Sequence, residues 1–244
     1  MPTSQKGLAP LLLILLAALG IIIFLLISQT FPFKDRLFSK LFPKPPSKAA
    51  VSTDTSYNLG VLVIKYFPLT SDSQNIDINV TGDVGEPYTT IRQRTIDVSN
   101  SLKASLEKAT RYLGYKDSAA QPALIYQIVD TKEYTQAVPT INRPARPRYP
   151  DYNGIMTAHN ICDYVDNRGV REVWLWAYQG PNKSDGFPYL SILESKMSGP
   201  FGDISNSYRY NDMPVCQNTY RVYTFNYGRW TAEALESWGH QMEA

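Results

Sequence analysis

The sequence of 244 residues has only two cysteines and two histidines, and it lacks several common catalytic motifs. It has no glycine-rich phosphate loop, no Cys-x-x-Cys pair, no Gly-x-Ser-x-Gly turn and no His-Glu-x-x-His pattern. These absences exclude the commonest sequence signatures of nucleotide-binding, thiol-redox, hydrolase and zinc-protease families. The sequence therefore predicts a location and an architecture, but no specific reaction.

Excess positive charge is also missing from most of the chain. The net charge is +2, yet residues 1–50 hold six basic residues against one aspartate, a net +5 that leaves −3 for residues 51–244. A mildly acidic body has no electrostatic footprint for nucleic acid, so we expect no nucleic-acid partner. A hydrophobic content of 43% and an aromatic content of 12% are enough to fill the core of one globular domain.

The N-terminal segment has no charged residue between Gly7 and Phe33. Its run "LAPLLLILLAALGIIIFLLIS" is longer than the apolar region of a cleaved signal peptide, and no cleavage site follows it. About 20 apolar residues span a bilayer as a helix, so residues 1–33 are predicted to be a transmembrane anchor that contacts the membrane through residues 8–31. Residues 34–56 are rich in proline and lysine and predict a semi-stiff tether.

Two signals disagree about the side of the membrane on which the domain lies. Five basic residues follow the anchor and only Lys6 precedes it, so the positive-inside rule places the domain in the cytoplasm. However, the opening "QKGLAPLLLILL" resembles the leader of prepilin-type exported proteins, which implies a domain outside the cytoplasm. Leu12 stands where true pilins carry a glutamate, which argues against assembly into a pilus. We favour an extracytoplasmic domain.

Residues 57–244 predict an α/β domain, because buried-looking strands alternate with amphipathic helices and glycine turns. The expected fold class is a single domain with a mixed, partly parallel sheet flanked by helices. The final helix has no C-cap residue before Ala244, which leaves open that the chain is a fragment. The predicted strands cover residues 59–69, 75–80, 123–129, 170–178 and 219–228. The predicted helices cover residues 97–113, 155–165 and a terminal stretch, with exposed loops at 139–153 and 194–214.

A ligand site is predicted where two of these strands end. Ligands of open α/β sheets usually bind beyond the carboxyl ends of the strands. Tyr178 follows one strand, Asn226 and Arg229 follow another, and Glu194 begins the long polar loop between them. We expect these four residues to bind substrate. The alternative is an ordinary strand-to-helix turn with Arg229 in solvent, and such turns outnumber sites.

The terminal helix carries a second candidate group. Glu233, Glu236 and His240 lie on one side of it, roughly 140° from the apolar side, and could supply acid–base catalysis. Glu236 and His240, four residues apart, could also ligate a divalent metal, which is the one cofactor that the sequence suggests. A solvated helix face explains the same pattern and is narrowly favoured.

The remaining features leave alternatives open. Asp203, Asn206 and Asp212 in the long polar loop could join Glu194 as calcium ligands, but the EF-hand spacing is absent. Cys162 and Cys216 could form a disulfide outside the cytoplasm, although Cys162 also fits a small buried apolar residue.

The sequence supports two hypotheses about function. One is a membrane-anchored extracytoplasmic hydrolase of envelope or extracellular polymers. The other is a non-catalytic tethered module that binds a glycan or a protein.

Overall fold

A computed structural model describes residues 56–111, 119–143, 146–180, 195–205 and 209–240. The predicted anchor and nearly all of the tether, together with Glu194, Asn206 and the last four residues, lie outside this described part. Within it, no helix combines the length and the apolar character that crossing a membrane requires.

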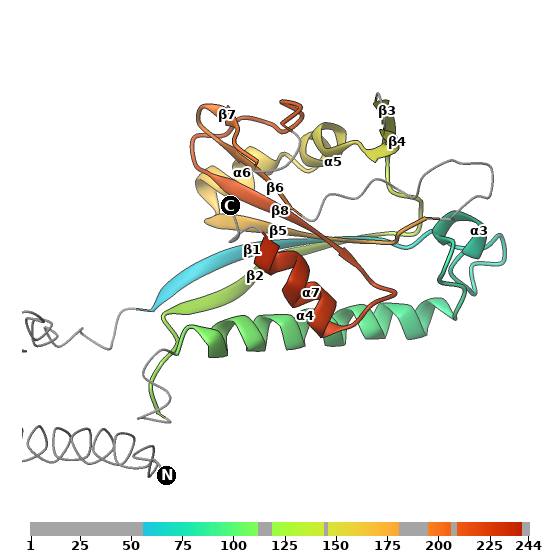
Figure 1. Cartoon of the computed structure of the whole chain (residues 1–244), viewed down its shortest axis with the longest axis horizontal. Coiled ribbons are helices and arrows are strands. Elements are labelled where there is room, and N and C mark those ends of the chain that lie inside the picture. The colour runs from blue at the N-terminus through green and yellow to red at the C-terminus, as the bar shows by residue number, and fades with distance from the viewer. Residues whose placement is uncertain (1–55, 112–118, 144–145, 181–194, 206–208, 241–244) are drawn as a thin grey trace, which may run out of the picture. The chain divides into compact units, whose positions relative to one another are not determined.

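A six-stranded mixed sheet forms the centre of the domain, with strand order β2-β1-β5-β8-β6-β7 (Figure 1). Four strands are parallel: β2 (Leu124–Tyr134), β1 (Tyr57–Tyr66), β5 (Val170–Ala177) and β8 (Tyr220–Asn226). Two antiparallel strands, β6 (Ser195–Gly199) and β7 (Gly202–Asp203), complete the edge beyond β8. The predicted mixed, partly parallel sheet of a single domain is confirmed.

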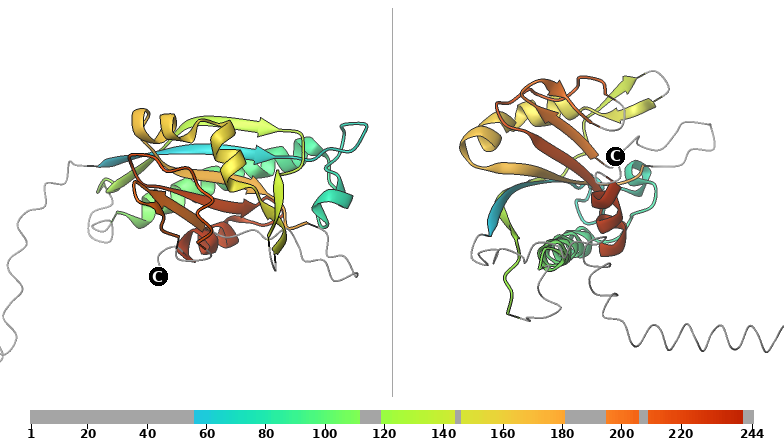
Figure 2. Two further views of the ribbon diagram at one scale, coloured as in Figure 1. Left: turned by 90° about the horizontal axis from the view of Figure 1, so that it is seen from above. Right: turned by 60° about the vertical axis from the view of Figure 1, so that its left-hand side comes forward.

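Helices cover both faces of this sheet (Figures 1 and 2). The long helix α4 (Tyr88–Ala109) and the terminal helix α7 (Thr231–Gly239) lie on one face, whereas α5 (Tyr152–Ala158) and α6 (Ile161–Asn167) lie on the other. Helix α4 buries a stripe of side chains at three- and four-residue spacing, as a helix with one face on a sheet must. The stripe consists of Ile91, Thr95, Val98, Leu102 and Leu106.

The central strands β1 and β5 are buried on both faces, as their continuous apolar sequences predict. Burial of this kind is expected of parallel strands that have helices on each side. The same strands bring polar residues into the interior, because Lys65 of β1 and Glu172 of β5 are also buried. These two charged residues are exceptions that need an explanation.

The predicted strand at residues 75–80 is wrong. Ile76 forms only an isolated bridge with Leu69, and residues Ile78–Thr81 form the short helix α3, with Ile78 52% exposed. The Asp77 side chain accepts a hydrogen bond from Asn79 N at 2.9 Å and so caps the helical turn. Local capping by Asp77 therefore overrides the alternation of isoleucine and valine.

The predicted exposed loop at residues 139–153 is also wrong. Strands β3 (Thr140–Arg143) and β4 (Arg146–Pro150) pair as a separate antiparallel hairpin, and Tyr149 is fully buried. A two-stranded hairpin tolerates prolines because its outer edge needs no backbone donors. The segment 194–214, which was also predicted to be an exposed loop, contains strands β6 and β7.

Two predicted helices differ in extent from the observed ones. Helix α4 begins at Tyr88, directly after Pro87, and ends at Ala109, so it starts earlier than the apolar stripe suggested. The predicted helix at 155–165 is two short helices, because Asn160 adopts a left-handed conformation with φ 49° between α5 and α6. Asparagine tolerates this conformation better than most residues.

Candidate functional site

The two strand ends predicted to form a ligand site lie side by side. Ala177 of β5 is the register partner of Asn226 of β8, and Tyr227 N donates to Ala177 O at 3.0 Å. Tyr178 is nevertheless part of the core. It is 1% exposed, and its hydroxyl accepts a hydrogen bond from Val138 N at 3.2 Å. This hydrogen bond fixes the segment before β3, so Tyr178 has a structural role.

Asn226 and Arg229 belong to a tight turn between β8 and α7. Asn226 Oδ1 accepts a hydrogen bond from Gly228 N at 2.7 Å, and a Cβ atom at Gly228 would lie 3.0 Å from both Asn226 Oδ1 and Val84 Cγ2. A side chain at Gly228 would therefore crowd this turn. Arg229 is exposed. The structure thus brings Tyr178 and Asn226 to one rim, with each side chain already bonded to backbone.

Of the three residues proposed for acid–base chemistry, Glu233 and Glu236 lie in α7 and His240 is its C-cap residue. Glu233 Oε2 accepts a hydrogen bond from Trp230 N at 3.2 Å, which caps the start of the helix. The Glu236 side chain is 68% exposed, and its Oε1 lies 4.0 Å from His240 Nε2. Glu233 is thus engaged by the backbone, and Glu236 and His240 form at most a loose pair on the surface.

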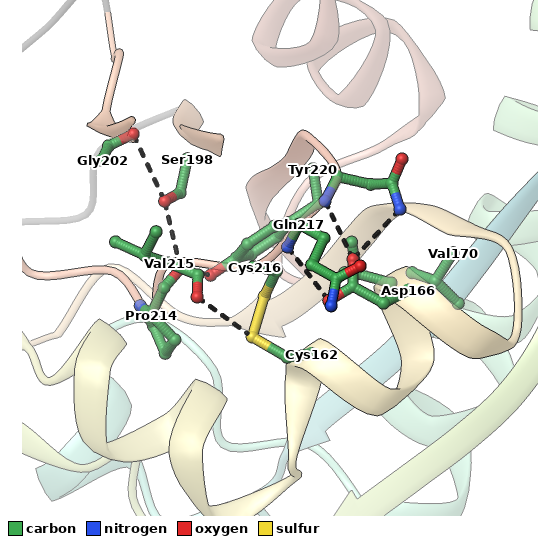
Figure 3. Close-up of a disulfide and its surroundings, with 12 residues drawn as sticks. Cys162, Asp166, Val170, Ser198, Gly202, Pro214, Val215, Cys216, Gln217 and Tyr220 are labelled. Carbon is green, nitrogen blue, oxygen red and sulfur yellow. Dashed lines mark hydrogen bonds between the residues drawn. A yellow bond between two sulfur atoms is a disulfide. The ribbon is translucent and has the colours of Figure 1, made fainter. Parts of the chain in front are cut away.

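The two cysteines join helix α6 to the segment before β8. Cys162 of α6 forms a disulfide with Cys216, with an S–S distance of 2.09 Å (Figure 3). Beside it, the Asp166 carboxylate accepts hydrogen bonds from Gln217 N at 3.0 Å and Asn218 N at 2.8 Å. Cys162, Asp166 and Cys216 are the one group of potential metal ligands found among the described residues. Because both sulfurs are in the disulfide, neither is a thiolate, and the group clamps α6 to the segment before β8.

Two of the acidic residues considered as calcium ligands instead surround a lysine. Lys196 Nζ lies 3.0 Å from Asp203 Oδ2 and 3.0 Å from Asp212 Oδ1, and all three side chains are buried. Arg143 adds a second contact to Asp212, at 3.3 Å. The chain's own ammonium group therefore neutralises these carboxylates, and the cluster joins the β3–β4 hairpin to β6 and β7.

A pocket with a volume of about 270 Å³ lies between α4 and the neighbouring strands β1 and β2. Its lining from α4 recurs at helical spacing along one side of that helix. Four of its five lining residues from the sheet are two register pairs on the face that α4 covers, since Val63 pairs with Thr131 and Lys65 pairs with Glu133. The helix contributes Arg92, Ile96, Ser99, Asn100 and Lys103, and the strands contribute Val63, Lys65, Ile128, Thr131 and Glu133.

Lys65 is the unusual residue of this pocket. It is only 5% exposed, and no hydrogen bond to its ammonium group is formed within the described part of the chain. The nearest carboxylate oxygen is Glu133 Oε2 at 4.0 Å, while Glu133 Oε1 accepts hydrogen bonds from the Tyr88 hydroxyl and from Arg92 Nε. Burial lowers the pKa of Lys65, and Arg92 adds to that effect while Glu133 opposes it.

No protein-family model, no curated protein and no solved structure matches this chain. Its function must therefore be inferred from the chemistry of the described residues. The pocket offers an ammonium group, on a largely buried side chain, whose hydrogen-bonding capacity no described residue fills, an arrangement suited to binding a negatively charged or strongly polar group. The sequence signal for this site is a lysine inside the apolar strand "LGVLVIKYFPL", which sequence reasoning passed over.

Proposed function

We propose that this chain is a membrane-tethered extracytoplasmic module whose ligand binds in the pocket between α4 and strands β1 and β2. The observation that carries the proposal is the Lys65 ammonium group, which lines the pocket without a hydrogen-bond partner among the described residues. A buried charge left in this state costs folding free energy. Such a cost is commonly found where a protein needs a group for binding rather than for stability.

Binding is better supported than hydrolysis. Glu133 is the one carboxylate among the described residues that line this pocket, and Tyr88 and Arg92 already occupy one of its oxygens. A second carboxylate or a histidine, which general acid–base hydrolysis would usually use, is not among the lining residues. The alternative catalytic set on α7 has Glu233 engaged in a helix cap and Glu236 in solvent.

The disulfide supports a location outside the cytoplasm. Disulfides persist in oxidising compartments and are rare in the cytosol, where thiols are kept reduced. The Cys162–Cys216 bond therefore agrees with the export suggested by the prepilin-like opening and disagrees with the positive-inside rule. The apolar run at residues 8–31 would hold the exported domain at the membrane.

Reporter fusions test this location. We expect a phosphatase that works only outside the cytoplasm to be active when fused after Ala244, and a cytoplasmic fluorescent reporter at the same place to be dark. Thiol labelling of the intact chain should find Cys162 and Cys216 blocked until a reductant is added. An inactive phosphatase together with a bright cytoplasmic reporter would overturn the extracytoplasmic assignment.

A further inference from the structure

We propose that the pocket beneath α4 binds a compact organic monocarboxylate, with the ligand carboxylate on Lys65 Nζ. This inference rests on the binding role proposed above and specifies its ligand class. It depends on three properties of the pocket: how much positive charge is left unpaired, which hydrogen-bonding groups face the ligand, and how large and how apolar the space is.

The charge balance of the pocket favours one negative charge on the ligand. Three cationic side chains line it, but Arg92 Nε lies 2.7 Å from Glu133 Oε1, and Lys103 Nζ lies 3.1 Å from Glu107 Oε1. Among the described residues, Lys65 is the one lining cation with no carboxylate within hydrogen-bonding distance. Lys65 and Arg92 share the single carboxylate of Glu133, and the net positive charge of this group matches one ligand carboxylate, whereas a phosphate dianion would keep an excess negative charge in a partly buried place.

The position of Glu133 keeps the Lys65 ammonium group available. The Tyr88 hydroxyl and Arg92 Nε hold one Glu133 oxygen, so the carboxylate is restrained by residues of α4. Its other oxygen stays 4.0 Å from Lys65 Nζ. The ammonium group therefore keeps donor capacity for a ligand, and charge-assisted hydrogen bonds of this kind are among the strongest in proteins.

The other polar groups suit an organic ligand that also carries hydroxyl or ether oxygens. Ser99 Oγ donates to Thr95 O at 2.7 Å, so it presents lone pairs that can accept a hydrogen bond from the ligand. Asn100 is exposed on the same side of α4 and has an amide that can donate and accept.

The size and the apolar part of the wall limit the body of the ligand. A volume of about 270 Å³ is at the small end for ligand pockets and admits one ring-sized group. Val63, Ile96 and Ile128 provide apolar contact for that group. A small acid, or a single acidic unit of a longer polymer, meets these limits.

Isothermal titration calorimetry on the full chain in detergent micelles tests the ligand class. The carboxylate probes are acetate, benzoate and glucuronate, the neutral counterparts are benzyl alcohol and glucose, and the competing anion is inorganic phosphate. We expect at least one carboxylate to bind, and to bind more tightly than its neutral counterpart and than phosphate. Affinity should weaken on raising the pH at a lower pH than an ordinary exposed lysine requires, because the pKa of Lys65 is lowered.

Two variants and a control assign the binding to this pocket. Lys65→Met removes the charge at similar volume and should weaken carboxylate binding about 10- to 100-fold, as loss of a hydrogen bond to a charged group does. Asn100→Asp, at an exposed position that should not disturb folding, places a like charge at the pocket and should also weaken binding. The control is Lys132→Met, because Lys132 pairs with Asp130 at 2.9 Å, is not among the lining residues, and should not affect affinity.

Several results would overturn the ligand class. They are binding of none of the carboxylates, tighter binding of phosphate, equal binding of glucose and glucuronate, or unchanged affinity in both pocket variants. The reporter fusions are independent of these titrations. A chain that is exported but binds no carboxylate refutes only the ligand class, whereas a chain that binds a carboxylate but stays in the cytoplasm refutes only the location.

Discussion

Lys65 and Glu133 are direct register partners on the parallel strands β1 and β2, yet their charged groups remain 4.0 Å apart. The other buried lysine of the sheet behaves differently, since Lys196 Nζ lies 3.0 Å from the carboxylates of both Asp203 and Asp212. Two carboxylates thus contact Lys196 at hydrogen-bonding distance, whereas Lys65 has one carboxylate near it at a longer distance. This difference separates a structural lysine from one that we assign to binding.

The first prediction compares the two lysines by substitution with methionine. Lys196→Met leaves two buried carboxylates without their main partner and should lower the free energy of unfolding by about 3–5 kcal/mol. Lys65→Met removes a buried charge while Arg92 and Tyr88 still hold Glu133, so it should leave that free energy unchanged or higher. Urea denaturation of the full chain measures both. A loss of more than about 2 kcal/mol in Lys65→Met would identify Lys65 as a structural residue instead.

The second prediction concerns Glu172, a buried residue of β5. Burial raises the pKa of Glu172 to about 7, despite the hydrogen bond that Trp174 Nε1 donates at 2.9 Å and the charge of Arg221. Tyr126 and Trp238 also face this carboxyl group. Its ordinary pKa of 4.5 applies to the unfolded chain, so between these two values the folded protein binds more protons than the unfolded chain. Stability should therefore fall as the pH rises from about 4.5 to about 7.

Glu172→Gln should abolish this decline, because the amide resembles the neutral acid and never ionises. The variant should match the unchanged protein near pH 4 and exceed its stability above pH 7 by on the order of 3 kcal/mol. Denaturation midpoints across this pH range measure the effect. Parallel pH profiles for the two proteins would show that Glu172 ionises normally in the folded state.

The parts of the fold that follow from local sequence patterns were predictable. The apolar runs of β1 and β5 indicate strands buried on both faces, and Gly169 marks the turn before β5 with its φ of 74°. The strand predicted at 75–80 fails for a local reason as well, because the Asp77 cap competes with an alternation of only three residues. Short periodic segments leave such competition undecided.

The candidate site was less predictable, because its pieces meet only in the folded chain. A lysine in an apolar strand is detectable in the sequence, but the spacing from Arg92 to Lys103 belongs to a helix whose position over β1 and β2 is a tertiary property. The same limit explains Asp203 and Asp212. Their acidity suggested a metal, and only the fold brings Lys196 between them.

A third prediction concerns the disulfide, which closes a long segment of the chain. Cys162 and Cys216 are 54 residues apart in sequence. The chain-entropy model assigns a cross-link of this length a stabilisation of about 4 kcal/mol. The double variant Cys162→Ser, Cys216→Ser should lose about that much, and reductant should destabilise the unchanged protein by a similar amount without affecting the double variant. Free thiols in the folded, untreated protein would refute the bond.

The last prediction tests the catalytic role that the sequence suggested for α7. If Glu233 serves as a helix cap, Glu233→Ala should lower the free energy of unfolding by about 1 kcal/mol, because it leaves Trp230 N without its acceptor. Glu236→Ala should change the free energy of unfolding by less than about 0.5 kcal/mol, since that side chain is 68% exposed.

Elemental analysis tests the metal role of the same residues. The purified full chain should hold well below one equivalent of divalent metal, with no change in His240→Ala. Stoichiometric metal that disappears in His240→Ala would instead support a metal site that includes His240.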